Sequence, residues 1–487
     1  MSKFHVIEKY QPKSKYKLLP FKFDQFNSDK YILTNVNGEY HLLAHEKLDK
    51  LINHSLDSND PELAEIFEAE KTLFNTDNEK SAIELLGLKL RTKYSRLPTF
   101  TNLHIFVVSL RCDHSCPYCQ VSRQSEDKAA FDMTQEMADK GLDFVFRSPS
   151  QALKIEFQGG EPLLNFEMVK YIVLEAKKRN LSLNRNLQFV IATTMSLITD
   201  EILDFCKEHK IIISSSLDGP EDLHNSNRPR PGKNSHQKFI EGLNKTREVL
   251  GFDQVSALMT TTEKSLPRVK EIIDEYIRLG FDGIFLRALS PYGFAIKTKK
   301  YMSYQADNWF EFYKEGLDYI IELNKNGIKF SEQYSSIVLT KILTSNDPGY
   351  VDLMSPSGAG IAAIVFNYNG YVYASDESRM LAEMGDETFQ LGHLLKDKYE
   401  DIMLSDKLLD ALEDSFTLSV PMCSDCAFEP YCGADPVYHH ATQKDLVGRK
   451  PESDFCKRNM SVFKHLIGLM EKDPETKNIF LGWANRC

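Results

Sequence analysis

Six short apolar segments recur between residues 99 and 300, and amphipathic stretches separate them. The apolar segments lie at 105–110, 153–157, 187–191, 211–216, 255–260 and 283–288. The stretches between them, such as MTQEMADKGLDFVF, FEMVKYIVLEAKKR and LPRVKEIIDEYIRL, have the spacing of helices with one apolar face. Strands that alternate with helices form a parallel sheet with crossover helices. The pattern therefore predicts an α/β fold, an open, partial (β/α)6 barrel over residues 99–300.

The flanking regions have patterns of their own. Residues 1–98 include a strand, the turn Asn37-Gly38 and a return strand, followed by the helical pattern AHEKLDKLI. This predicts a small α+β module that resembles a winged helix. Residues 301–350 are expected to form a helical bridge. Residues 351–487 hold the hairpin pattern IAAIVFNYNGYVYA and are expected to form a C-terminal domain.

Composition limits the class of protein. A chain of 487 residues is too long for one ordinary core, and its net charge of -11 argues against a large nucleic-acid footprint. No stretch approaches the roughly 20 apolar residues of a membrane helix, and the N-terminal residues lack the apolar segment of a signal peptide. We therefore expect a cytoplasmic protein with neither membrane nor nucleic-acid partner.

Nine cysteines in such a protein indicate metal or redox chemistry rather than disulfides. Cys112, Cys116 and Cys119 follow the first predicted strand, which places three thiolates on one tight loop. That arrangement fits three irons of a [4Fe–4S] cubane and leaves the fourth iron open. The alternative is a zinc site or three buried thiols, although structural zinc usually has four protein ligands. Cys206 and Cys487 stand alone.

The spacing Cys-x3-Cys-x2-Cys, with the aromatic Tyr118 before the last cysteine, resembles the signature of the radical S-adenosylmethionine (SAM) superfamily. The resemblance implies that SAM chelates the open iron and is cleaved reductively to a 5′-deoxyadenosyl radical.

Motifs at the next three strand ends carry the same resemblance. Gly159-Gly160-Glu161-Pro162 looks like the family's GGEP motif, which contacts the amino group of SAM. Ala-Thr-Thr-Met departs from the usual threonine–asparagine–glycine turn, but leaves Thr193 and Thr194 as possible hydroxyl partners. The segment from Ser214 to Asp218, with His224 and Arg228 after it, resembles that of peptide-modifying members. Arg228 would pair with the SAM carboxylate, or be only a surface arginine. The predicted SAM contacts are Tyr118, Gly159, Gly160, Glu161, Pro162, Thr194, Ser216, Asp218 and Arg228.

A second cysteine group consists of Cys423, Cys426, Cys432 and Cys456. Alone, these four residues fit zinc equally well. After a radical SAM barrel they resemble the SPASM domain, whose full pattern has seven cysteines for two auxiliary clusters. Three are missing here: Ser375 and Pro436 stand at two of the positions, and SPSGAG lacks the third. The resemblance therefore implies one auxiliary [4Fe–4S] cluster with four protein ligands, which serves electron transfer or structural support.

Over nearly the whole chain the arrangement resembles SPASM-type peptide maturases, most of all those of the His-Xaa-Ser system. The resemblance implies a precursor peptide as substrate and an electron donor such as flavodoxin or ferredoxin, and it allows for a second maturase. Residues 25–55 would capture the leader of the precursor as an added strand, or simply cap the barrel. Two alternatives are a formylglycine-generating enzyme like the anaerobic sulfatase maturases, and a non-enzymatic iron–sulfur or zinc protein. No catalytic acid or base is identified, because Asp376 and Glu377 fit a proton acceptor or a solvated loop.

Overall fold

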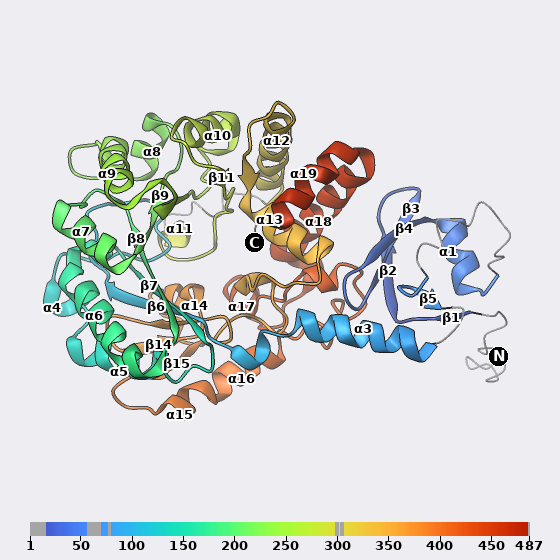
Figure 1. Cartoon of the computed structure of the whole chain (residues 1–487), viewed down its shortest axis with the longest axis horizontal. Helices are drawn as coiled ribbons and strands as arrows, with labels where there is room; N and C mark the ends of the chain where they lie inside the picture. The colour runs from blue at the N-terminus through green and yellow to red at the C-terminus, as the bar shows by residue number, and fades with distance from the viewer. Residues whose placement is uncertain (1–15, 56–69, 76–78, 298–300, 302–305, 486–487) are drawn as a thin grey trace.

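The computed structural model describes residues 16–55, 70–75, 79–297, 301 and 306–485. Figure 1 shows the N-terminal strands at one end of the molecule and the barrel at the other. The C-terminal helices α18 (Asp454–Lys472) and α19 (Pro474–Ala484) lie between them. None of the helices in the described ranges is both long and apolar enough to cross a membrane.

Five parallel strands form the barrel sheet, in the order β10-β9-β8-β7-β6. Their burial alternates: Ile155, Ile191 and Ile213 are buried, whereas Glu156, Ala192 and Ser214 are partly exposed. The predicted α/β fold is confirmed. The strands are β6 (Leu103–Ser109), β7 (Ala152–Gly159), β8 (Asn186–Thr193), β9 (Ile212–Ser216) and β10 (Val255–Leu258).

Helices of the predicted amphipathic pattern connect these strands. Side-chain caps fix where some of them begin: the hydroxyl of Thr134 accepts from the Met137 amide, and that of Thr199 from the Ile202 amide. The barrel helices are α4 (Lys128–Phe131), α5 (Gln135–Val145), η4 (Pro162–Asn165), α6 (Phe166–Leu183), α7 (Asp200–His209), α8 (Glu221–Asn227), α9 (Ser235–Leu250), η5 (Phe252–Gln254), η6 (Leu266–Arg268), α10 (Val269–Arg278) and α11 (Phe294–Lys297).

The sixth predicted strand differs from expectation. Only β11 (Gly283–Ile284) is extended, and it pairs with β12 (Ser331–Glu332) outside the main sheet. The amide of Leu286 bonds the Glu332 carboxylate instead of a neighbouring strand, at 3.1 Å. A buried side chain thus takes the hydrogen bond that a strand ladder would supply. Two helices flank β12, α12 (Ala306–Lys325) and α13 (Gln333–Leu343).

The predicted tail hairpin is present, and it extends the barrel sheet. Strand β13 (Ala363–Phe366) lies parallel to β6, and β14 (Tyr371–Tyr373) and β15 (Gln390–His393) follow antiparallel. One sheet thus contains strands from both sides of residue 351, where the sequence predicts a domain boundary. The other tail elements are η7 (Val351–Leu353), α14 (Asp376–Ala382), α15 (Tyr399–Met403), α16 (Asp406–Glu413), η8 (Glu429–Tyr431), α17 (Pro436–Gln443) and η9 (Lys450–Glu452).

The N-terminal module contains the predicted strand–turn–strand–helix unit. Its antiparallel sheet has the order β2-β3-β4, and Gly38 in the turn has φ +99°. Strand β3 alternates between two cores: Leu33 packs in the module's own core and Ile32 in the main one. The elements are β1 (Lys17–Leu18), β2 (Phe21–Gln25), β3 (Lys30–Asn35), β4 (Tyr40–Ala44), α1 (His45–Ile52), β5 (Phe74–Asn75), α3 (Glu79–Lys93) and η3 (Leu97–Thr99).

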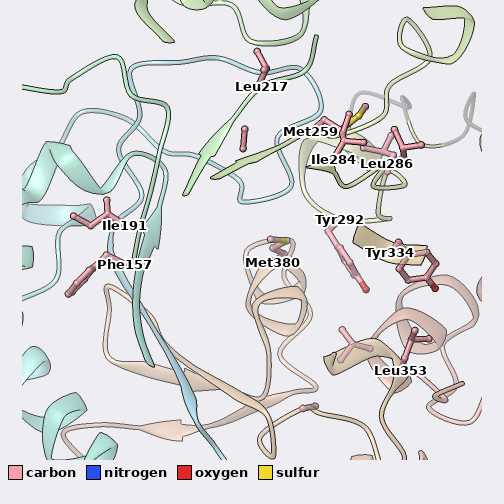
Figure 2. Close-up of a cluster of buried hydrophobic side chains, with 14 of the residues drawn as sticks. Phe157, Ile191, Leu217, Met259, Ile284, Leu286, Tyr292, Tyr334, Leu353 and Met380 are labelled. Atoms are coloured by element: carbon pink, nitrogen blue, oxygen red, sulfur yellow. The ribbon is translucent and has the colours of Figure 1, made fainter. Parts of the chain in front are cut away.

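One main core joins the barrel to the tail. It contains residues from the barrel strands, such as Phe157 and Ile191, and residues from the tail, such as Leu353 and Met380. Figure 2 shows these side chains together with Tyr292 and Tyr334. The tail is therefore packed on the barrel as part of the same hydrophobic unit.

Candidate active site

The carboxyl ends of the five parallel strands surround a cavity of about 230 Å³. Active sites of barrels of this kind lie at that end. All three loop cysteines line the cavity. Six of the nine predicted SAM contacts also line it: Tyr118, Gly159, Gly160, Thr194, Ser216 and Arg228. The other three, Glu161, Pro162 and Asp218, are buried behind its wall.

Gly159 and Gly160 let the end of β7 approach the cysteine loop closely. A Cβ on Gly159 would lie 1.9 Å from the carbonyl oxygen of Ser109, and one on Gly160 would lie 2.3 Å from that of Arg111. The Gly160 amide donates to the Ser109 carbonyl at 2.9 Å, and the Glu161 amide to the Arg111 carbonyl at 2.8 Å. The two glycines thus fix the start of the cysteine loop against the sheet.

Glu161 holds the end of the next strand. Its carboxylate accepts from the hydroxyl of Thr193 at 2.7 Å, and from the amide and hydroxyl of Thr194 at 2.8 and 2.7 Å. It also accepts from the Leu163 amide at 3.1 Å. Burial raises the pKa of this carboxyl, and the hydrogen bonds from the threonines lower it. The two threonines that depart from the family pattern are therefore the partners of Glu161. Its predicted contact with the amino group of SAM stays a prediction.

Asp218 connects three parts of the site. It accepts from the Tyr118 hydroxyl at 2.6 Å, and from the Arg228 guanidinium at 3.0 and 3.2 Å. It also accepts from the Thr260 amide at the end of β10, at 3.3 Å. Arg228 lies 5.6 Å from the centre of the Tyr118 ring. The structure thus excludes the surface alternative for Arg228, since its side chain is only 12% exposed.

Sequence reasoning missed a buried hydrogen-bonded chain behind the cysteine loop. The His114 ring bonds Asp113 at 2.7 Å and the Ser235 hydroxyl at 2.9 Å. Ser235 also bonds His224 at 3.0 Å, and the other nitrogen of His224 accepts from the Asp218 amide at 3.3 Å. The chain links the cysteine loop to Asp218. A histidine between two of the cysteines was the signal available in the sequence.

The donor groups of the loop can be compared with the needs of zinc and of a cluster. Structural zinc usually has four protein ligands, and the loop has three cysteines. The ligand atoms of Asp113, His114 and Cys112 lie within 4.8 Å of one another, but His114 is already bonded to Asp113 and Ser235. Three thiolates without a fourth ligand fit a [4Fe–4S] cluster with one open iron better than zinc. The four tail cysteines have the number of ligands that suits zinc or a cluster.

The four tail cysteines line a second cavity, of about 560 Å³. The first three of them, Cys423, Cys426 and Cys432, lie on the loop around η8. The fourth, Cys456, lies in the first turn of α18. The hydroxyl of Ser453 caps this helix by accepting from the amide of Cys456. Phe23 of β2 also lines this cavity. The sequence-predicted ligands are thus brought together beside the N-terminal module.

The module is fixed to the tail-cysteine loop by polar contacts. Lys22 pairs with Glu429 at 3.1 Å, and Lys93 donates to the carbonyl of Pro430 at 2.6 Å. The Tyr431 hydroxyl donates to the carbonyl of Gly38 at 2.6 Å.

Four charged side chains also line the barrel cavity. They are Arg123, Glu156, Arg287 and Asp376, and the Nε of Arg123 is buried without a hydrogen-bond partner. Three further carboxyls lie close in sequence to the positions where cysteines are missing: Asp352, Glu377 and Asp435. Burial, followed by repulsion from Asp352, raises the pKa of Glu377 to about 7. Of the remaining cysteines, Cys206 is fully buried in α7, and Cys487 lies outside the described residues.

Residues 106–274 match the family model described as the Radical SAM superfamily. This segment holds the three loop cysteines and every predicted SAM contact. The match identifies a radical SAM domain in this part of the chain. The roles predicted for the individual cysteines and strand-end residues stay predictions.

Two relatives match parts of the chain. The chain is 32% identical over 189 residues to an uncharacterized protein of Methanocaldococcus jannaschii. The aligned segment covers 38% of this chain and 62% of that protein. The chain therefore spans less than two thirds of that relative. It is 25% identical over 293 residues to the cysteine-type anaerobic sulfatase-maturating enzyme of Clostridium perfringens, covering 56% of this chain and 74% of the enzyme.

Two solved structures share the fold. Native anSMEcpe with bound AdoMet matches with a TM-score of 0.62 and 18% identity, over 78% of this chain and 99% of that one. Streptococcus suis SuiB bound to its precursor peptide SuiA matches with a TM-score of 0.53 and 14% identity, over 90% and 99%. The chain thus shares its fold with anSMEcpe and SuiB.

Proposed function

We propose that this protein is an enzyme that cleaves SAM reductively and uses the radical to modify residues of a ribosomally synthesised peptide. The observation that carries the proposal is the single cavity that three cysteine thiols share with the glycine, threonine and arginine side of the SAM motifs.

Cys112, Cys116 and Cys119 would hold the [4Fe–4S] cluster, with SAM beside it. When bound, the cluster supplies the electron that cleaves SAM to methionine and a 5′-deoxyadenosyl radical. The protein's part is to hold these groups in position. Thr194 and Ser216 offer hydroxyls on the cavity wall, and Arg228 offers a guanidinium whose charge Asp218 balances.

The charged side chains that line the cavity support a peptide substrate. Glu156, Asp376, Arg123 and Arg287 offer hydrogen-bond partners of both signs, which suit side chains and backbone better than an apolar molecule. SuiB, which shares the fold, binds a precursor peptide. We assign Asp376 as the acceptor of a proton that leaves the substrate, because it lines the cavity on the N-terminal turn of α14.

Replacing Asp376 with asparagine tests this role. We expect the variant to form 5′-deoxyadenosine at the normal rate and to modify the peptide at least tenfold more slowly, because only the second step needs the acceptor. Equal loss of both products would contradict the assignment.

The N-terminal sheet supports capture of the leader. In the described residues β2 and β4 each pair with β3 on one side only, and an unpaired edge is a template for an added strand. We expect a precursor without its leader to be modified far more slowly than the full one. The electron donor would be a flavodoxin or ferredoxin, and a second maturase would act on the same precursor.

Formylglycine formation is the second candidate function, and it is favoured by the similarity to the Clostridium perfringens maturase. Mass spectrometry of a co-expressed precursor peptide separates the outcomes. Loss of hydrogen by residues other than cysteine or serine supports a peptide maturase. Oxidation of one cysteine or serine to formylglycine supports the second candidate. An unchanged peptide that also incorporates no deuterium from heavy water would contradict both, since deuterium uptake reports epimerisation.

A further inference from the structure

Side chains span the distance between the barrel cavity and the tail cysteines, where this chain lacks the ligands of an inner cluster. Arg287 lines the barrel cavity and also a small cavity of about 40 Å³ behind it. Tyr350 and Tyr334 line the same small cavity. Arg287, Tyr350 and Tyr334 therefore form a row of polar side chains, which starts at the active site and extends toward the tail.

Aromatic packing continues the row. Phe285 stacks on Tyr334 with ring centres 5.9 Å apart and an angle of 8° between the rings. Tyr350 meets both of these rings at 6.2 Å. Figure 2 shows Tyr334 among the buried side chains of the main core.

A buried amide ends the row at the tail cysteines. The Tyr334 hydroxyl donates to Oδ1 of Asn459 at 2.5 Å, and Nδ2 of Asn459 donates to Sγ of Cys432 at 4.0 Å, the long end of the range for a bond to sulfur. Asn459 is completely buried on α18. With its oxygen bonded to the Tyr334 hydroxyl, the amide has its N–H directed toward Cys432.

We propose that Asn459, oriented by Tyr334, is a positioning residue that donates a hydrogen bond to the Cys432 thiolate and raises the reduction potential of the auxiliary cluster. This inference rests on the proposed four-cysteine cluster. Reduction adds negative charge to a cluster, and hydrogen bonds to its sulfurs stabilise that charge, so they raise the potential. The row from Arg287 through Tyr350 and Tyr334 then joins the active site to this hydrogen bond in place of the missing inner cluster.

Potentiometric titration followed by electron paramagnetic resonance tests the proposal. The full chain carrying Cys112→Ala, Cys116→Ala and Cys119→Ala retains only the auxiliary cluster, so the signal has one source. At the potential where this protein is half reduced, we expect Asn459→Leu to lower the ratio of reduced to oxidised cluster at least threefold. That is about 28 mV for a one-electron couple, in which a tenfold change corresponds to 59 mV. Tyr334→Phe should shift it in the same direction by a smaller amount.

Tyr313→Phe is the matched control, because its equally buried hydroxyl bonds Ser335 at 2.6 Å. It should leave the potential unchanged. If Tyr334→Phe and Asn459→Leu both retain the cluster at the original potential, the inference is wrong while the proposed function stands. If the parent protein with intact tail cysteines takes up no cluster, the ligand assignment fails and the inference fails with it.

Discussion

Asp218 is the residue on which the geometry of the SAM side depends. It is completely buried, and it holds Tyr118 of the cysteine loop, Arg228 after α8 and the amide of Thr260. Removal of one partner from a buried ion pair leaves the other charge without compensation. The site is therefore sensitive to this carboxylate whether or not SAM touches it.

Asp218→Asn should lower the free energy of unfolding by about 3 kcal/mol, because it leaves the buried Arg228 guanidinium without a counter-charge. Thermal unfolding measures the effect. The matched control is Asp222→Asn, which removes a pair with Arg268 in which Asp222 is 71% exposed. Such a surface pair contributes at most about 1 kcal/mol. Equal destabilisation by the two variants would refute the account of Asp218.

Gly160→Ala should reduce the iron content of the reconstituted protein, because its Cβ would overlap the carbonyl oxygens of Arg111 and Leu110 and displace the cysteine loop. Iron analysis and the absorbance of the cluster measure this. Gly87→Ala in α3 is the control, since a Cβ there has no neighbour within 4 Å, and should stabilise the helix by about 0.5–1 kcal/mol. Full iron content in Gly160→Ala would contradict this role of the glycine.

At the scale of residues, the sequence predicts those residues of the candidate site that can be recognised from their spacing along the chain. The three loop cysteines, the glycine pair and Arg228 all follow strand ends, so they meet at one edge of the sheet. The bonds between Glu161 and the two threonines, and the bridge from His114 to Ser235, depend on side-chain directions that no local pattern encodes. Burial of Arg228 was also beyond sequence reasoning, because its pairing with Asp218 requires the turn of α8.

At the scale of elements, apolar patterns predict the main strands, but one segment with such a pattern does not join the barrel sheet. Strands β6–β10 and the two hairpins follow their apolar patterns and turn residues. The segment 283–288 has an equally apolar pattern, but Glu332 captures a backbone amide of that segment, so only two residues pair as a strand. The place of the tail hairpin beside β6 is a contact between distant segments, and nothing in either segment specifies it.

The pH dependence of docking between the N-terminal module and the tail follows from Lys93. Burial, followed by the nearby Lys341, lowers the pKa of Lys93 to about 7 in the folded protein. Between this value and the ordinary lysine pKa, the unfolded chain binds one proton more than the folded chain. The free energy of unfolding therefore rises with pH in this window, by up to about 1.4 kcal/mol per pH unit.

Comparison with Lys93→Met isolates this effect. The thermal midpoint of the wild type should rise relative to that of the variant between pH 7 and pH 9. A difference that stays constant across this range would show that Lys93 keeps its charge when it is buried against the Pro430 carbonyl.

At the scale of the whole molecule, the two cysteine groups line two separate cavities, which are the two proposed iron sites. The three loop thiols line the barrel cavity, and the four tail thiols line the cavity beside β2. The main hydrophobic core, and not either cluster, holds the barrel and the tail together. We therefore expect each site to assemble without the other.

Iron counts after anaerobic reconstitution test this independence. The wild type should hold about eight iron atoms per chain, and replacement of either cysteine group by alanine should leave about four. Loss of all iron after replacement of one group would mean that the clusters assemble together. Zinc in place of iron in the tail would refute the auxiliary cluster.

The central claim is that three thiols near the end of β6 hold a cluster that delivers an electron to SAM. Its most direct test is formation of 5′-deoxyadenosine by the anaerobically reconstituted protein with SAM and a strong reductant. We expect the wild type to form it, and the variant with Cys112, Cys116 and Cys119 replaced by alanine to form none, while the variant without the tail cysteines stays active. The account would be contradicted if the wild type formed no 5′-deoxyadenosine, or if the loop variant formed as much as the wild type.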